Sequence, residues 1–199
     1  SFDLSFFNLS YQDRIGFVQR AYRDGSVKSE RGNVGDANIL GVESLIDVNL
    51  KEFSGINNNN YLFNVFLNTS FIDSEYVKSE EPGVTGKKVE FIPNSNIKIG
   101  LRFGYKNFLF STQYTFLSSQ YTDSSNAVAG NLSGVIGLIP SYEIVDISSS
   151  FLVGRFKLEL GINNLLDKAY YTRRATGYPG PGIITSPNRN IYFTTQFKI

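Results

Sequence analysis

The stretch "IKIGLRFGY", residues 97–105, alternates apolar and small or basic residues along its whole length. The apolar positions are Ile97, Ile99, Leu101, Phe103 and Tyr105, and the positions between them are Lys98, Gly100, Arg102 and Gly104. Successive side chains on a strand point to opposite sides, so this pattern predicts a β-strand with one apolar and one polar face. The period of two, in place of the helical 3.6, decides the fold class.

The same alternation recurs along the chain in both directions. It is clear at 107–122, 155–163 and 191–199, and less regular at 2–18, 39–50, 61–76 and 142–153. Counted together, these segments predict an all-β chain of eight strands. Near Phe6 and Phe7 the alternation changes phase, which predicts either a β-bulge or an aromatic belt at a membrane surface.

Composition excludes several functions. The 199 residues include no cysteine, histidine, methionine or tryptophan. Disulfides, zinc–thiolate sites, Ser-His-Asp triads and histidine bases are therefore excluded, and we expect no enzyme, no catalytic residue, no metal ligand set and no cofactor. The net charge is +1 without a basic block, so nucleic acid is not an expected partner. The sequence contains no run of 18 apolar residues, so it predicts no transmembrane helix.

The connections between the predicted strands differ in length. They are tight at 105–107 and 153–155, of middling length at 50–60, and long at 21–36, 79–95, 123–140 and 172–190. Short turns at one end of the strands and long loops at the other are typical of an outer-membrane barrel. The predicted strands also suit a bilayer, which a tilted strand crosses in roughly 9–11 residues. Aromatic residues, at 15% of the chain, fit such a barrel or a soluble β-sandwich.

The predicted polar face carries charged side chains. They are Glu43, Asp47, Lys98, Arg102, Lys157 and Glu159. The interior of an eight-stranded barrel is just wide enough for its own side chains, so a closed barrel of this size would need every one of these charges paired. A wide, wet lumen or one filled by a polar plug accepts them more easily. The remaining alternative is the solvent face of a soluble sheet.

The C-terminal third carries a more specific signal. It reads "IPSYEIVDISSSF" at 139–151, "LELGINNLLDKAYYTRRATGYPGPGI" at 158–183 and "PNRNIYFTTQFKI" at 187–199. This part resembles the end of TonB-dependent outer-membrane receptors, in which a strand ending "NNLxDKxY" leads into the last extracellular loop. The matching residues are Asn163, Asn164, Leu165, Asp167, Lys168, Tyr170, Arg189 and Tyr192. "FFNLSYQDRIG" at 6–16 and "ANILGVESLIDV" at 37–48 resemble earlier strands of the same family.

The resemblance implies a transmembrane antiparallel β-barrel in the outer membrane of a Gram-negative bacterium. Family members have 22 strands around an N-terminal plug, so residues 1–199 are interpreted as the last eight strands, with the plug and the earlier strands before Ser1. The family usually ends in Phe, whereas here Phe197 stands two residues before the terminal Ile199. The motif residues are expected to be structural, ending a strand and starting a loop; they include Asn163, Asn164, Asp167, Tyr170 and Arg189.

The function implied by the resemblance is TonB-dependent active import of a metal chelate, a ferric siderophore or ferric citrate. The implied partners are the chelate, the TonB–ExbB–ExbD complex acting through the plug, and outer-membrane lipid and lipopolysaccharide. A passive porin-like channel and a soluble β-sandwich binding or adhesin module remain open as alternatives.

The predicted last extracellular loop supplies the candidate ligand-binding residues. Arg173 and Arg174 offer two planar guanidinium forks, which suit a multiply charged anion. Tyr171 and Tyr178 would add stacking and hydroxyl contacts. The alternative is that the arginines pair with acidic residues of neighbouring loops or with lipopolysaccharide phosphates.

Overall fold

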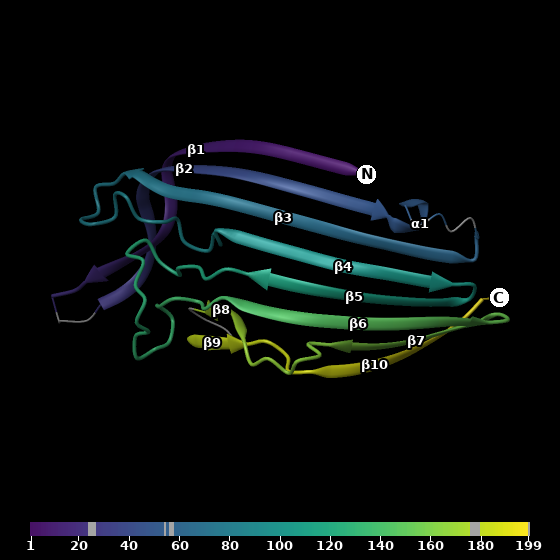
Figure 1. Ribbon diagram of the computed structural model, residues 1–199. Coiled ribbons are helices and arrows are strands. Elements are labelled where there is room, and N and C mark those ends of the chain that lie inside the picture. Colours follow the sequence, from purple (N-terminus) through teal and green to yellow (C-terminus); the bar gives the residue numbers. More distant parts are fainter. Residues whose placement is uncertain (24–26, 54, 56–57, 176–179, 199) are drawn as a thin grey trace.

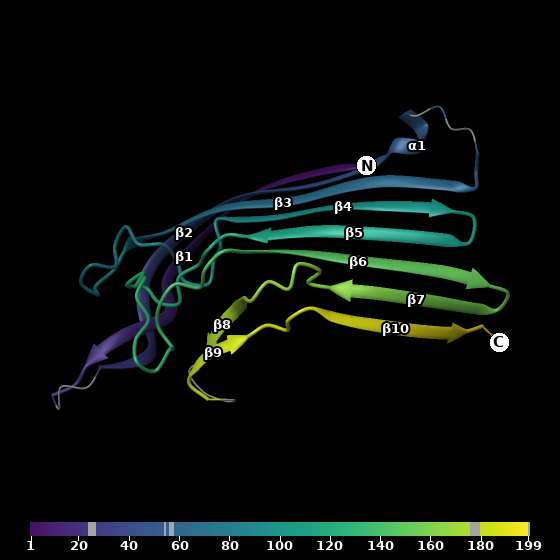
Figure 2. The ribbon, with the colours of Figure 1, turned by 60° about the horizontal axis from the view of Figure 1, so that its bottom comes forward.

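The computed structural model describes residues 1–23, 27–53, 55, 58–175 and 180–198. Eight antiparallel strands form one sheet, in which each strand pairs with the next one along the chain and β7 pairs with β10. They are β1 (Phe2–Ala21), β2 (Val27–Asn49), β3 (Tyr61–Lys78), β4 (Ser95–Tyr105), β5 (Phe108–Leu117), β6 (Tyr142–Val153), β7 (Phe156–Asn163) and β10 (Asn190–Phe197). The sheet is curved and open, with β1 and β10 at its edges (Figures 1 and 2).

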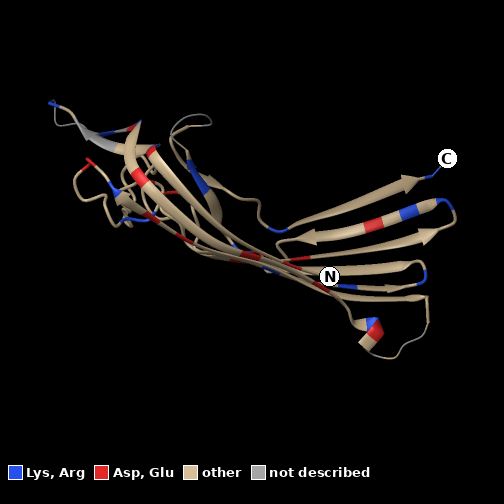
Figure 3. Cartoon of the chain, turned by 90° about the horizontal axis from the view of Figure 1, so that it is seen from above, with Lys and Arg blue, Asp and Glu red and all other residues tan. Residues whose placement is uncertain are grey.

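Strand register confirms the two predicted faces. Paired residues share a face, so Ile99 lies beside Leu67 and Tyr114 on what we call the apolar face. The polar face is the opposite side, and the register places all the charged residues predicted for it there: Glu43, Asp47, Lys98, Arg102, Lys157 and Glu159. In the view from above, long stretches of strand carry no charge, and many charged residues lie toward the strand ends (Figure 3).

The apolar face has the features of a lipid-facing surface. On β3 it is apolar from Tyr61 to Phe71, apart from Thr69, a length that matches the roughly 9–11 residues of a bilayer crossing. Its large side chains are exposed, for example Phe193 at 66%. Aromatic rings gather near the short-turn end, as girdles do at a membrane interface. The ring pairs there are Tyr61–Tyr105 and Phe156–Phe197, which contact each other in tilted geometry with centroids 4.6 and 5.0 Å apart.

The predicted difference in connection length between the two ends of the strands is confirmed for most connections. Two-residue turns join β4 to β5 and β6 to β7, helped by positive φ at Lys106 (52°) and Gly154 (57°). The short helix α1 (Leu50–Phe53) lies in the connection at the same end. The loops after β3, β5 and β7 are long and lie at the other end (Figure 1). Among the described residues, no helix is long and apolar enough to cross a membrane.

Two predicted loops are wrong in part. The expected loop at 21–36 is mostly paired strand, because β1 runs to Ala21 and β2 begins at Val27. The sequence did not predict this part of the two strands, because their pairing extends beyond the apolar stretch of the sheet and the residues there do not alternate between apolar and polar. The expected loop at 172–190 contains most of a small hairpin of β8 (Tyr171–Ala175) and β9 (Gly182–Thr185).

The phase change at Phe6 and Phe7 is not a bulge. Pairing with β2 is continuous from Phe2 to Tyr11, and the register shifts only between Tyr11 and Ile15. Phe7 instead lies on the polar face against Gly41, where a Cβ atom would come within 2.2 Å of its ring. Phe66 covers Gly100 and Tyr192 covers Gly161 in the same way. An aromatic ring over a cross-strand glycine therefore interrupts the alternation without changing the register.

The buried core lies at the long-loop end. Its members are Val18, Val34, Ala37, Ile39, Tyr76, Val84 and Val89. Val84 and Val89 come from the loop after β3, which folds back onto β1, β2 and β3. This core gives the loops a fixed base on which a binding site can be built.

Candidate ligand-binding site

A buried ion pair attaches the β3–β4 loop to the sheet. Glu90 is only 2% exposed, and Arg14 Nη1 donates to its Oε1 at 2.6 Å. The Tyr76 hydroxyl donates to Oε2 of the same carboxylate at 2.7 Å, and Arg14 also contacts that hydroxyl. A buried carboxylate is tolerated only when it is paired and hydrogen-bonded. The contacts therefore fix Glu90, and with it the loop, to β1 and β3.

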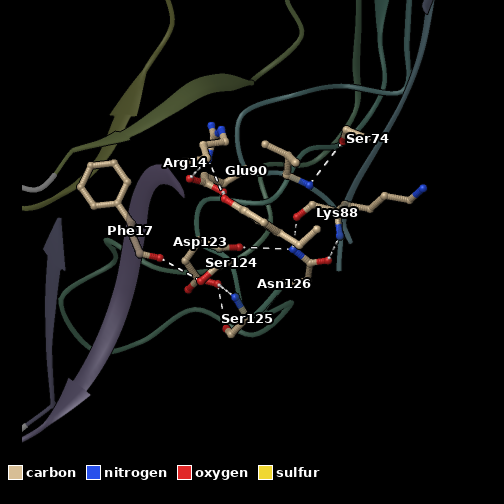
Figure 4. A network of polar contacts seen from close by, with 11 residues as sticks. Arg14, Phe17, Ser74, Lys88, Glu90, Asp123, Ser124, Ser125 and Asn126 are labelled. Atoms are coloured by element: carbon tan, nitrogen blue, oxygen red, sulfur yellow. Dashed lines mark hydrogen bonds and ion pairs between the residues drawn. The ribbon is translucent and has the colours of Figure 1, made fainter. Parts of the chain in front are cut away.

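The β5–β6 loop is attached to the β3–β4 loop and to β1. The Asn126 side chain donates to the Lys88 carbonyl at 2.8 Å and accepts from the Lys88 amide at 2.7 Å. Ser124 Oγ donates to the carbonyl of Phe17 at 3.1 Å (Figure 4). The Phe91 amide also donates to the Tyr121 carbonyl at 2.8 Å. Two loops that are distant in sequence therefore form one ordered layer.

Arg174 joins the β8–β9 hairpin to the same layer. Its Nη1 donates to the carbonyl of Gly134 at 2.8 Å, and its Nη2 donates to the carbonyl of Leu138 at 3.2 Å. The Tyr171 hydroxyl lies 3.0 Å from Nη2 and donates to Leu138 at 3.1 Å. The guanidinium also lies 5.4 Å from the centre of the Tyr171 ring. Arg174 thus directs much of its hydrogen-bonding capacity to the protein itself.

These loops enclose a cavity of about 460 Å³. It is lined by Phe17, Arg31, Phe91, Gln120, Thr122, Val135, Ile136, Thr172, Arg173, Arg174 and Ala175. Three of these residues are arginines, and no carboxylate is among the described lining residues. Phe17 and Phe91 meet edge to face at 6.1 Å, and the Arg31 guanidinium lies 5.6 Å from the Phe17 ring centre. The cavity is therefore cationic with an aromatic wall.

The structure brings only part of the predicted site together. Arg173 and Arg174 both line the cavity, and Arg173 is exposed. Tyr171 contacts Arg174 and Leu138 and is not among the lining residues. Tyr178 lies outside the described residues.

Three of the lining residues that sequence reasoning missed carry a charge or an aromatic ring. Arg31 falls in the stretch expected to be a loop, and Phe17 and Phe91 carry no local motif. Phe91 reaches the cavity from a left-handed backbone position, with φ of 60°, directly after the anchored Glu90. Such a position in a non-glycine residue follows from the tertiary contacts on both sides of it.

The chemistry available here is recognition of anions. Guanidinium groups form planar, charge-assisted hydrogen bonds to carboxylates, and aromatic rings pack against flat ligands. Within the described ranges, no group of three or more acidic side chains could hold a metal ion.

The motif residue Asn164 joins the end of β7 to its surroundings. Its backbone amide donates to Asp146 Oδ1 at 2.8 Å, and its φ is 52°. Its side chain donates to the Lys168 carbonyl and accepts from the Lys168 amide, both at 2.9 Å. Asn and Asp suit such positions because their side chains bond nearby backbone groups.

The other motif residues connect the start of β10 to the same corner. Asp167 accepts from the Arg189 amide at 2.9 Å and forms an ion pair with the Arg189 side chain at 3.4 Å. The Asn163 side chain donates to the Asn190 side chain at 3.0 Å, between paired strands. The Tyr170 ring lies 4.6 Å from that of Tyr142. These contacts set the base from which the β8–β9 hairpin extends.

The geometry defines a class of protein. A single antiparallel sheet with an exposed apolar face, a charged opposite face and long loops at one end is the wall of a transmembrane β-barrel. Residues 1–165 match the family model for the TonB dependent receptor-like β-barrel. The chain therefore belongs to this family, whose barrels lie in the Gram-negative outer membrane and are transporters, not enzymes.

Solved structures share the fold. The unliganded ferric citrate transporter FecA matches with a TM-score of 0.74 and 20% identity, over 98% of this chain and 28% of that one. The ferric yersiniabactin uptake receptor FyuA from Yersinia pestis matches with a TM-score of 0.69 and 17% identity, over 98% and 27% of the chains. The copper transporter OprC gives a TM-score of 0.65 and 18% identity, over 98% and 28%. The chain thus spans little more than a quarter of these proteins.

Proposed function

We propose that this chain forms part of a receptor that actively imports an anionic metal chelate, such as ferric citrate or a ferric siderophore. The observation that carries the proposal is the cationic cavity between the loops. Arg31 of β2 and the adjacent Arg173 and Arg174 of β8 reach it from two places in the sequence, and the described part of its lining offers no carboxylate to neutralise them. Such a site favours a ligand with several negative charges.

Ferric citrate fits this chemistry because its carboxylates are planar anions that guanidinium forks can bind in pairs. Of the two adjacent arginines, Arg173 is the better placed for this role, because it is exposed, whereas Arg174 bonds two loop carbonyls. The Phe17 and Phe91 rings would pack against the body of the chelate. Of the three similar structures described above, two transport ferric chelates by name and one transports copper. The family likeness thus agrees with a metal cargo, and the choice of chelator is argued from the residues of the cavity.

We further propose that the sheet is one sector of a larger closed barrel that contains a plug and is energised through the TonB–ExbB–ExbD complex. Two facts support this. β1 and β10 each have one unpaired edge among the described residues, and lipid does not tolerate unpaired strand edges. The similar structures are also several times longer than this chain.

Growth on single iron sources tests the import function. Deleting the complete gene should abolish growth on ferric citrate, or on one anionic ferric siderophore, when iron is limiting. The gene supplied on a plasmid should restore that growth, and collapsing the proton gradient should stop uptake. Unchanged growth on every chelate would contradict the proposal. Uptake that continued without the proton gradient would instead support a passive channel.

A further inference from the structure

One polar side chain in the lining of the cationic cavity is not used by the fold. Gln120 lies in the β5–β6 loop and is only 9% exposed. Its backbone is held on both sides, because its amide donates to the Ile139 carbonyl at 3.1 Å and the Ile139 amide donates to its carbonyl at 2.9 Å. Its side-chain amide, by contrast, makes no hydrogen bond to any other described residue.

The neighbouring Thr122 shows that the Gln120 side chain is directed toward the cavity. Both residues line it, as expected for alternate positions of an extended chain. The Thr122 hydroxyl is fully engaged, since it donates to the Gly137 carbonyl at 3.0 Å and accepts from the Gly137 amide at 3.1 Å. The polar atoms of Gln120 are not among the sealed, unpartnered ones of the described chain, so they are open to the cavity. Gln120 is therefore buried, fixed at its backbone and available to a ligand.

The chemistry of Gln120 differs from that of the arginines around it. A guanidinium only donates hydrogen bonds, whereas the Gln120 side chain donates from Nε2 and accepts at Oε1. An ionised carboxylate only accepts, so it would use the Nε2 donor and place negative charge beside Oε1. A neutral amide carries its donor and its acceptor on two separate atoms, as Gln120 does. A ligand amide therefore complements this side chain where a carboxylate does not.

We propose that Gln120 recognises a neutral amide of the imported chelate, so that the preferred ligand carries amides as well as carboxylates. This inference rests on the proposed function, and it narrows the class of chelate that the function admits. The arginines bind the carboxylates, and Gln120 binds an amide in the same cavity of about 460 Å³. Ferric citrate has carboxylates and no N–H group, so it would engage the arginines alone. A site built to hydrogen-bond one group discriminates against ligands that lack it, because its own polar atoms are then left unpaired.

Titration of the complete purified receptor with three ferric chelates tests this role. The first chelate is a citrate-based dihydroxamate whose arms are joined through secondary amides, the second is the same compound with those amide nitrogens methylated, and the third is ferric citrate. Wild-type receptor should bind the methylated chelate about tenfold more weakly than the first, the range for losing one or two hydrogen bonds. Gln120→Leu should weaken binding of the first chelate by a similar factor and leave the affinities for the other two unchanged.

The matched control is Gln113→Leu, the same substitution on β5 at a residue that does not line the cavity. It should leave all three affinities unchanged, and heat-resistant migration on a gel checks that each variant has folded. An equal loss for all three chelates in Gln120→Leu would overturn the proposal, because Gln120 would then only shape the cavity. Unchanged affinity for the first chelate would overturn it as well, while leaving the proposed function intact. A wild-type receptor that bound none of the three would instead refute the proposed function, and this inference with it.

Discussion

Replacing Arg14 by methionine will detach the β3–β4 loop from the sheet while leaving the barrel strands folded. The substitution keeps much of the side-chain volume but leaves the Glu90 carboxylate, 2% exposed, with Tyr76 as its remaining side-chain donor. Removing one partner of a buried ion pair costs roughly 3–5 kcal/mol. Because Phe91 directly follows Glu90 and lines the cationic cavity, the aromatic wall of the site will be lost with the loop.

Hydrogen exchange of the loop amides measures this effect. Residues 79–94 should lose protection in Arg14→Met, while the strands and the heat resistance of the full-length protein stay unchanged. Arg23→Met, the same substitution at an exposed residue of the β1–β2 connection, serves as the control. The double variant Arg14→Met with Glu90→Gln should recover much of the protection, since it buries no unpaired charge. Full protection of the loop in Arg14→Met alone would show that the ion pair does not anchor it.

Replacing Arg173 by alanine will weaken the binding of ferric citrate about 10- to 100-fold, the range for losing a hydrogen bond to a charged group of roughly 1.5–3 kcal/mol. Arg173 is exposed in the cavity, and within the described ranges its side chain makes no hydrogen bond comparable to those of Arg174, so the barrel should be unaffected. Arg174→Ala should also weaken binding, by a different route. It removes the bonds to Gly134 and Leu138 that hold the β8–β9 hairpin to the β5–β6 loop.

Titration of the purified receptor with ferric citrate measures both changes. Arg23→Ala removes one positive charge from the same end of the protein but not from the cavity, and it should leave the affinity unchanged. Only Arg174→Ala should increase hydrogen exchange in β8 and β9. An affinity that stayed unchanged in both Arg173→Ala and Arg174→Ala would remove these arginines from the binding site.

The sheet could be predicted from the sequence because its signals are local. In "IKIGLRFGY" the polarity of each residue indicates which face of the sheet it lies on. Lys106 and Gly154 each mark a turn whose length is set by two or three residues. Phe7 misled this reasoning because its position is explained by Gly41 on the neighbouring strand, and not by its neighbours in the chain. Cross-strand contacts of this kind appear only when the register is known.

The candidate site could be predicted only in part. Arg173 and Arg174 stand side by side in a recognisable C-terminal pattern, so their position near a ligand was a reasonable expectation. Arg31 and Phe91 enter the same cavity through the β1–β2 hairpin and the Glu90 anchor, which are tertiary features without a sequence motif. The sequence also suggests equal roles for the two arginines, whereas the contacts of Arg174 with the β5–β6 loop give it a structural role as well.

The central claim is that this sheet is a sector of a larger barrel, and expressing residues 1–199 alone tests it most directly. The edges of β1 and β10 would then expose unpaired N–H and C=O groups, which lipid cannot satisfy. The account predicts that the complete gene product migrates as a heat-modifiable monomer after extraction from the outer membrane, whereas residues 1–199 alone form no such species. A monomeric, heat-resistant barrel made by residues 1–199 alone would contradict it.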